Sequence, residues 1–122
     1  MRITDLPGYL PGKAPKYKAT RVKGTAYGDF DSKGEYSHYL YLLEQQRLGV
    51  ITDLERQVVY PIVINGTKVC TVKPDYRYKR NGEVIVADYK GIVLPMAKLK
   101  FKLVKAVYGV HIVIITKIGQ GF

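Results

Sequence analysis

The chain has 122 residues, of which 47% are hydrophobic and 25% are charged, as is typical of one soluble globular domain. It has no apolar run of about eighteen residues, so we expect neither a membrane-spanning helix nor a membrane partner. The N-terminus lacks the apolar core of a secretory signal. The one cysteine, Cys70, excludes an intramolecular disulfide and the paired-cysteine metal motifs, so we expect a reducing, cytoplasmic location.

The charge is strongly positive and unevenly distributed. Twenty Lys and Arg residues stand against ten Asp and Glu residues, which gives a formal charge of +10. Residues 1–28 hold six basic groups and one acid, and after Asp88 the chain contains lysines but no acid. A solubilising surface would explain part of this excess, but the asymmetry favours a polyanionic partner.

A non-periodic N-terminal region is followed by a clear signal for the start of a helix. Residues 1–28 are rich in Gly, Pro, Lys and Tyr and have no periodicity, which predicts a basic arm ahead of a single domain at 29–122. Ser32 and Glu35 form the two ends of a capping box. Apolar and aromatic residues then recur at helical spacing, so we expect a helix at about 32–47.

The middle of the chain carries strand and turn signals. The apolar run 57–64 is followed by Asn65-Gly66, a strong two-residue hairpin turn. A second strand is expected over 67–78, bent near its proline, and a third over 83–90 after a second Asn-Gly turn. These signals predict a three-stranded meander.

A second helix follows the meander and precedes one more strand. Pro95 suits the first turn of a helix that ends before Gly109, and 110–116 is an apolar strand that we expect to be buried. The predicted fold class is α/β, an α+β arrangement with a mixed sheet. Its order is helix, three-strand meander, crossover helix, strand.

The second Asn-Gly turn predicts which residues face each other. In a two-residue turn Arg80 pairs with Glu83, and Asp75 then lies opposite Asp88, on the same face as Lys90. Two facing carboxylates repel by about 4 kcal/mol at about 4 Å and an effective dielectric near 20. Protonation of one acid, compensation by the lysine, or a divalent cation such as Mg²⁺ would relieve this repulsion. A longer turn would instead leave both aspartates solvated at strand ends.

The same residues resemble a nuclease signature. Pro74-Asp75, twelve further residues and Asp88-Tyr89-Lys90 resemble the PD-(D/E)xK motif, and the spacer holds a hairpin with the apolar strand EVIVA. Nearly the whole chain after the arm is similar to small phage endonucleases of this family, which are related in fold to phage and archaeal Holliday-junction resolvases. The resemblance implies a restriction-endonuclease-like core and a homodimer that cuts branched double-stranded DNA. It also implies Mg²⁺ as cofactor, with Mn²⁺ as a substitute, and the host cytoplasm for a phage-encoded chain.

The resemblance also implies roles for individual residues. Asp75 and Asp88 match the metal-binding carboxylates, and the backbone carbonyl of Tyr89 completes the coordination. Lys90 matches the lysine that orients or helps to activate the attacking water. The second acid of the motif is Asp rather than the commoner Glu, and its shorter side chain shifts the metal geometry.

Two further residues match the family, one of which also has a structural explanation. Glu35 matches the acid that these enzymes supply from the first helix, as a catalytic group and a further metal ligand. Its place in the capping box explains it without catalysis. Gln57 sits where the phage relatives carry a glutamine and is assigned an accessory role.

The second helix carries lysines without neighbouring acids. Lys98, Lys102 and Lys105 share one stripe, opposite the apolar residues Met96, Leu99, Leu103 and Val107. Such a stripe is ordinarily a solvated face, but its uniform charge favours phosphate contacts. The predicted DNA-binding side chains are these three lysines together with Lys13, Lys16, Lys18, Arg21 and Lys23 of the arm.

The leading hypothesis is a metal-dependent, structure-selective endodeoxyribonuclease, a Holliday-junction resolvase with no small-molecule substrate. One alternative is a nuclease of the same fold that nicks DNA, cuts flaps or degrades DNA generally. Another is a non-catalytic basic DNA-binding module, which leaves the motif acids and lysine without a function. A ribosome-associated RNA-binding protein fits the charge but does not explain the facing aspartates.

Overall fold

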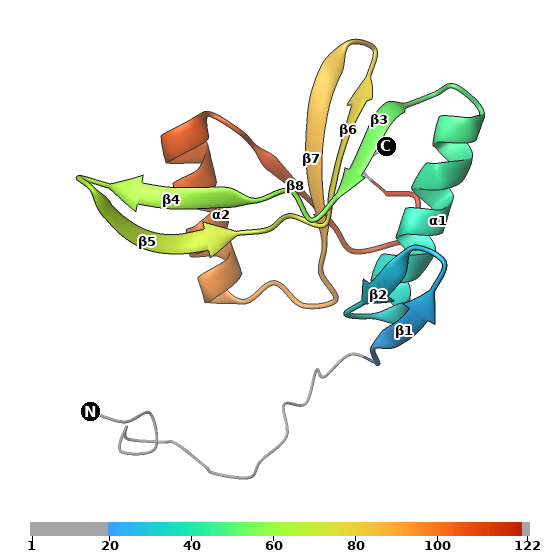
Figure 1. The fold of residues 1–122 in the computed structure, drawn as a ribbon, viewed down its shortest axis with the longest axis horizontal. Helices are drawn as coiled ribbons and strands as arrows, with labels where there is room; N and C mark the ends of the chain where they lie inside the picture. Colours follow the sequence, from blue (N-terminus) through green and yellow to red (C-terminus); the bar gives the residue numbers. More distant parts are fainter. Residues whose placement is uncertain (1–19, 121–122) are drawn as a thin grey trace, which may run out of the picture.

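The computed structural model describes residues 20–120 and has a mixed α+β fold (Figure 1). Within this range there are two helices and eight strands, and the strands form three sheets. Lys13, Lys16 and Lys18, three of the predicted DNA-binding residues, lie outside the described residues. The elements are β1 (Val22–Thr25), β2 (Gly28–Phe30), α1 (Lys33–Arg47), β3 (Thr52–Arg56), β4 (Tyr60–Ile64), β5 (Thr67–Val72), β6 (Tyr76–Arg80), β7 (Glu83–Tyr89), α2 (Pro95–Tyr108) and β8 (Ile112–Ile115).

A four-stranded mixed sheet lies at the centre of the fold. Its strand order is β3-β6-β7-β8, in which β8 runs parallel to β7 and the other pairs are antiparallel. Arg80 pairs with Glu83 across a two-residue turn in which Asn81 (φ 52°) and Gly82 (φ 79°) are both left-handed. The predicted register of this hairpin is therefore confirmed.

Both predicted helices are confirmed, and local signals define their ends. The Ser32 hydroxyl oxygen accepts a hydrogen bond of 3.0 Å from the Glu35 N–H at the start of α1. The Glu35 carboxylate accepts from the N–H of Asp31, so the reciprocal bond of the capping box is displaced by one residue from Ser32. The helix α2 begins at Pro95 and ends at Gly109, whose φ of 71° is left-handed.

The predicted three-strand meander is wrong, because β4 and β5 form a separate two-stranded sheet. Pro74 lies between β5 and β6 and has no N–H for a continuing ladder, which divides the predicted second strand in two. Besides β7, β6 pairs with β3, a strand that the sequence did not predict. Gln57 is not in a strand but at the bend between β3 and β4, with a φ of 55°.

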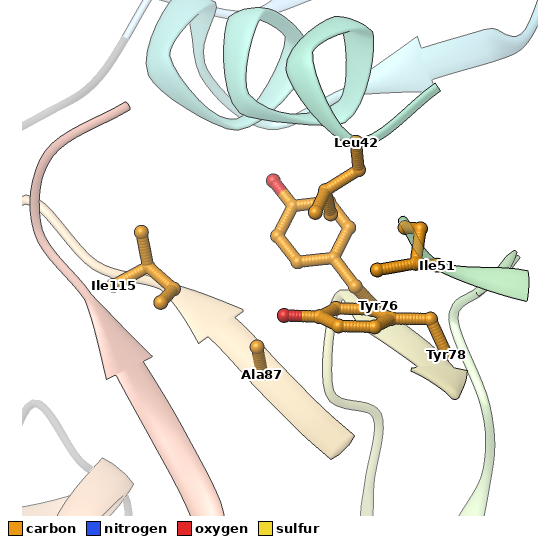
Figure 2. Close-up of a cluster of buried hydrophobic side chains, with 6 residues drawn as sticks. All are labelled: Leu42, Ile51, Tyr76, Tyr78, Ala87 and Ile115. Atoms are coloured by element: carbon orange, nitrogen blue, oxygen red, sulfur yellow. The ribbon is translucent and has the colours of Figure 1, made fainter. Parts of the chain in front are cut away.

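The central sheet is covered on both faces. One core packs α1 against β6, β7 and β8, and Figure 2 shows Tyr76 and Tyr78 of β6 beneath Leu42 of that helix. The other core packs α2 and the β4–β5 hairpin on the sheet. Val86 belongs to the second core and Ala87 to the first, as the alternation of side chains along β7 requires. The strand that carries Asp88 is therefore held from both sides.

The face of α2 that contacts the sheet differs from the predicted one. Val104 is fully buried, whereas Met96 and Leu99 of the predicted apolar stripe are 61% and 53% exposed. The helix contacts β4, β5 and β8, and the side chains that pack into the second core are Val104, Phe101 and Leu103. None of the helices formed by residues 20–120 is long and apolar enough to cross a membrane.

The N-terminal part of the described chain forms a hairpin, β1–β2, that lies beside α1 (Figure 1). The predicted boundary between arm and domain, at residues 28 and 29, falls inside this hairpin. Residues 22–30 are thus attached to the domain.

Candidate functional site

Two buried aspartates lie side by side where β6 begins and β7 ends. Asp75 is 8% exposed and Asp88 is 3% exposed. The Asp75 N–H donates a hydrogen bond of 3.0 Å to Oδ1 of Asp88, and the Tyr89 N–H donates one of 2.8 Å to Oδ2 of Asp75. Backbone groups therefore orient both carboxylates, and the predicted pairing of the two acids is present.

A lysine stands next to this pair. The Lys90 Nζ lies 3.1 Å from Oδ2 of Asp88, and the Lys90 N–H donates to the carbonyl of Ile115 in the neighbouring strand region. Among residues 20–120, Oδ2 of Asp88 has no partner with hydrogen-bond geometry, although it is buried. The lysine therefore balances the charge of this oxygen at ion-pair distance without forming a hydrogen bond to it.

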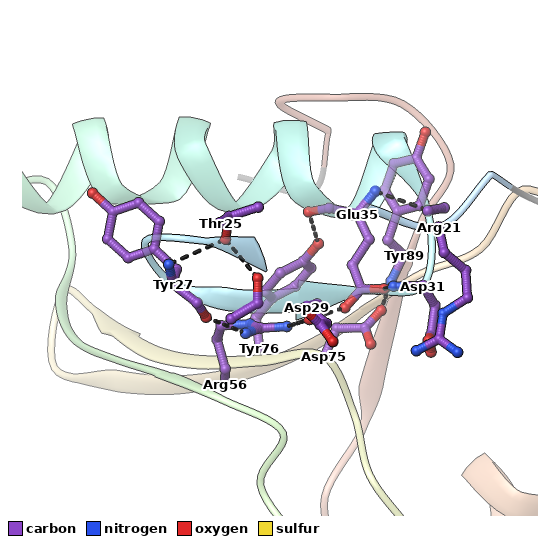
Figure 3. A network of polar contacts seen from close by, with 12 residues as sticks. Arg21, Thr25, Tyr27, Asp29, Asp31, Glu35, Arg56, Asp75, Tyr76 and Tyr89 are labelled. Carbon is purple, nitrogen blue, oxygen red and sulfur yellow. Dashed lines mark hydrogen bonds and ion pairs between the residues drawn. The ribbon is translucent and has the colours of Figure 1, made fainter. Parts of the chain in front are cut away.

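Glu35 extends the acidic site from the first turn of α1, as Figure 3 shows. Its side chain is 4% exposed, and its Oε2 accepts from the N–H of Asp31 at 3.1 Å. The Tyr76 hydroxyl donates to the carbonyl of Glu35 at 2.7 Å and ties the helix to β6. Glu35 and Asp75 line one cavity together with Lys90. The structure thus brings the helix acid to the strand acids.

Arg56, at the end of β3, is a residue of this site that the sequence analysis missed. Its guanidinium donates to the carbonyls of Tyr27 (2.8 Å) and Asp29 (2.9 Å), and it stacks 3.6 Å from the ring centre of Phe30. It also lies 3.7 Å from Oε1 of Glu35 (Figure 3). The local sequence around Arg56 gives no signal of these contacts, because every residue that it contacts here lies more than twenty positions earlier in the chain, in the β1–β2 hairpin or in α1.

The packing of the acids shifts their protonation. Burial, followed by the negative charges of Asp88 and Glu35, raises the pKa of Asp75 to about 9. Burial likewise raises the pKa of Glu35, against the hydrogen bond from Asp31 and the charge of Arg56. Burial opposes the charge of Lys90, but Asp88, Asp75 and Glu35 together outweigh it, so the pKa of this ammonium is raised. Burial and the mutual proximity of the three acids therefore both oppose ionisation of the site.

Comparison with known proteins places the chain in a family. A family model described as "Protein of unknown function (DUF1064)" matches residues 14–118. The chain belongs to the DUF1064 family. No curated protein and no solved structure matches it.

The donor set of this DUF1064 chain fits a hard divalent cation. Two buried oxygens, Oδ2 of Asp88 and Oε1 of Glu35, have no hydrogen-bond partner in the described part of the chain. Carboxylate oxygens are the ligands that Mg²⁺ and Mn²⁺ prefer, and Mg²⁺ keeps several waters when it binds to few carboxylates. Within residues 20–120 no group of three or more His, Cys, Asp or Glu side chains already has the geometry of a metal site. The carboxylates that could hold such an ion are those of Asp75, Asp88 and Glu35, with water completing its coordination.

The remaining predicted residues lie at different distances from this centre. The Gln57 side chain is exposed, but its N–H donates to the carbonyl of Asp75 at 3.2 Å, so its backbone contacts the site. The exposed Arg21 lies 3.6 Å from Asp31, whose N–H donates to the carboxylate of Glu35. Lys23 is exposed on β1. The stripe of α2 is exposed and lines a cavity of about 270 Å³ next to β8, with Lys98, Lys102 and Lys105 around Phe101, Ile112 and Ile114.

Proposed function

We propose that this DUF1064 protein is a Mg²⁺-dependent endodeoxyribonuclease with a restriction-endonuclease-like core that resolves branched DNA. The observation that supports this proposal most directly is the centre formed by Asp75, Asp88 and Lys90. Its two buried carboxylates face each other, and Oδ2 of Asp88 has an ion pair with Lys90 but no hydrogen bond. A purely structural site has little use for such a pair, since it stays buried only when one acid is protonated or a cation balances it.

The residues of the centre have distinct roles in this proposal. Asp75, Asp88 and the carbonyl of Tyr89 would hold Mg²⁺, with Glu35 as the next acid. When bound, the ion lowers the pKa of water and neutralises charge on the phosphate. Lys90 places a compact ammonium beside the reacting phosphate and helps to position the attacking water. The water oxygen forms a bond to phosphorus while one bridging P–O bond breaks.

The charge of the whole chain supports DNA as the partner. A formal charge of +10 in 122 residues favours a polyphosphate, and this excess steers association with DNA at low salt. We propose a homodimer in the cytoplasm as the active species, because paired nicks on opposite strands of a junction need two centres related by a two-fold axis.

The substrate is tested by cleavage of a synthetic four-way junction and of a linear duplex with the same arm sequences, both with Mg²⁺. We expect paired nicks in the junction and little cutting of the duplex. Equal cutting of the junction and the duplex would contradict junction resolution and would support a general nuclease. An active monomer in sedimentation would exclude the proposed dimer.

A further inference from the structure

Two cavities meet at the proposed centre, one on each side of Lys90. The first, of about 410 Å³, lies towards α1 and is lined by Glu35 and Asp75. The second, of about 280 Å³, lies between α2, β5 and the end of β7 and is lined by Asp88. Lys90 and Ile92 border both, so the two cavities are adjacent.

The two cavities differ in charge. The charged residues of the α1-side cavity are three acids and two lysines, namely Asp31, Glu35, Asp75, Lys33 and Lys90. The α2-side cavity has three lysines and a single acid, namely Lys73, Lys90, Lys100 and Asp88. The first composition suits a cation and the second suits an anion.

Lys73 and Lys100 are the cations of the α2-side cavity that the centre does not use. Lys90 is paired with Asp88, whereas neither Lys73 nor Lys100 has an ion pair with a carboxylate among residues 20–120. Lys73 is exposed just after β5 and Lys100 is half-buried on α2, so the two reach the cavity from different elements. Unpaired ammonium groups that converge on a concave surface are a suitable binding site for a phosphate group.

Two neutral features of this cavity also suit a phosphate. Thr71 contributes a hydroxyl-bearing side chain to its wall. The first turn of α2 borders it, and no side chain caps that turn at Leu94. Free N–H groups at a helix start add positive potential to that of the lysines.

We propose that the α2-side cavity binds the phosphate next to the one that is cleaved, with Lys73 and Lys100 as its ligands. This inference rests on the proposed nuclease function. The cleaved phosphate occupies the carboxylate centre, and the strand continues past Lys90 into the positively charged cavity. The predicted stripe at Lys98, Lys102 and Lys105 lies on another side of the same helix and faces β8, so it contacts phosphates further along the DNA.

The test pairs two variants of the full-length protein with chemically altered DNA. One variant carries Lys73→Ala and Lys100→Ala, and its matched control carries Lys98→Ala and Lys102→Ala, which removes the same charge from the other side. Each is assayed with Mg²⁺ on junctions in which one phosphate at a time, on either side of the cleaved one, is replaced by an uncharged methylphosphonate.

For the wild type and the control, we expect loss of one flanking charge to lower kcat/KM roughly tenfold, as for a charge-assisted hydrogen bond. For the Lys73/Lys100 variant, kcat/KM should be roughly tenfold or more lower on unmodified DNA, and the same methylphosphonate should then have little further effect. Thermal unfolding should be nearly unchanged for the control, whose lysines are exposed, and is measured for the Lys73/Lys100 variant so that any loss of the half-buried Lys100 packing is accounted for.

The outcomes separate this inference from the proposed function. A wild-type protein that cuts the DNA, with the methylphosphonate effect unchanged in the Lys73/Lys100 variant, would overturn only the phosphate site. If the methylphosphonate effect is instead lost in the Lys98/Lys102 control, the flanking phosphate binds on the β8 side of α2, and the proposed site is wrong. A wild-type protein that cuts no DNA with Mg²⁺ would overturn the nuclease function and this site with it.

Discussion

Gly34 is the position where a single methyl group tests the packing of the candidate site. An added Cβ would lie well inside 3.0 Å of Cε1, Cζ and the hydroxyl of Tyr89, closer than real Cβ atoms approach other groups. Gly34 is in the first turn of α1, where Ala should otherwise stabilise the helix by roughly 0.5–1 kcal/mol. The missing side chain is therefore explained by the tyrosine ring and not by the helix backbone.

We expect Gly34→Ala to destabilise the protein despite its better helix propensity. Overpacking of this kind costs about 1–3 kcal/mol, because the ring of Tyr89 must leave its place between α1 and the sheet. After the propensity gain is subtracted, the net loss in free energy of unfolding is about 1 kcal/mol. The assay is urea unfolding of the wild type, Gly34→Ala, Tyr89→Ala and the double variant, with Lys33→Ala as a control for the helix start.

In the Tyr89→Ala background the sign should reverse, because the ring is gone. There Gly34→Ala should stabilise by roughly 0.5–1 kcal/mol, which is its intrinsic effect. The coupling free energy between the two positions should thus be about 1.5–2 kcal/mol. Equal stabilisation by Gly34→Ala in both backgrounds would refute the close approach of Tyr89 to α1.

The other predictions concern charge and metal binding. Asp88→Asn should abolish the stabilisation that Mg²⁺ gives the wild type, which is about 2.7 kcal/mol when Mg²⁺ is at a hundredfold excess over Kd. A similar Mg²⁺-dependent shift of Tm in both proteins would contradict the assignment of Asp88 as a metal ligand. Lys90→Ala should lower the cleavage rate by about 10²-fold or more, whereas a change below about tenfold would mean that this lysine only balances charge. Burial lowers the pKa of His38 to about 4, so the folded state binds protons more weakly than the unfolded state, for which the reference pKa is 6.5. The stability tied to this group is intact above pH 6.5 and is lost as pH falls through about 4, by up to about 1.4 kcal/mol per unit. The free energy of unfolding of the wild type should therefore fall relative to that of His38→Gln between pH 7 and 4, and a constant difference would exclude the buried neutral histidine.

The parts of the fold that were predictable depend on local signals. Ser32 and Pro95 define helix starts within one turn of chain, and Asn81-Gly82 fixes a register because its two residues must both be left-handed. That register brings Asp75 to Asp88, so the centre of the candidate site follows from a two-residue turn.

The parts that were missed depend on contacts between distant segments. The β4–β5 hairpin leaves the central sheet because Pro74 interrupts the ladder and α2 offers a second apolar surface, and neither effect appears in the periodicity of 57–78. Arg56 belongs to a short strand, and its partners in β1–β2 and α1 are separated from it in sequence. The burial of α2 around Val104 likewise depends on that hairpin.

The most direct measurement of the central claim is DNA cleavage by the purified protein with Mg²⁺ and with EDTA, alongside Asp75→Asn and Asp88→Asn. DNA binding by all three proteins is measured in Ca²⁺. We expect the wild type to cut a four-way junction only with Mg²⁺, and both variants to bind the junction at least as tightly without cutting it, because each loses a metal ligand and a negative charge near phosphate. Cleavage at the wild-type rate by either variant would contradict the assignment of the carboxylate pair as the metal-binding, catalytic centre.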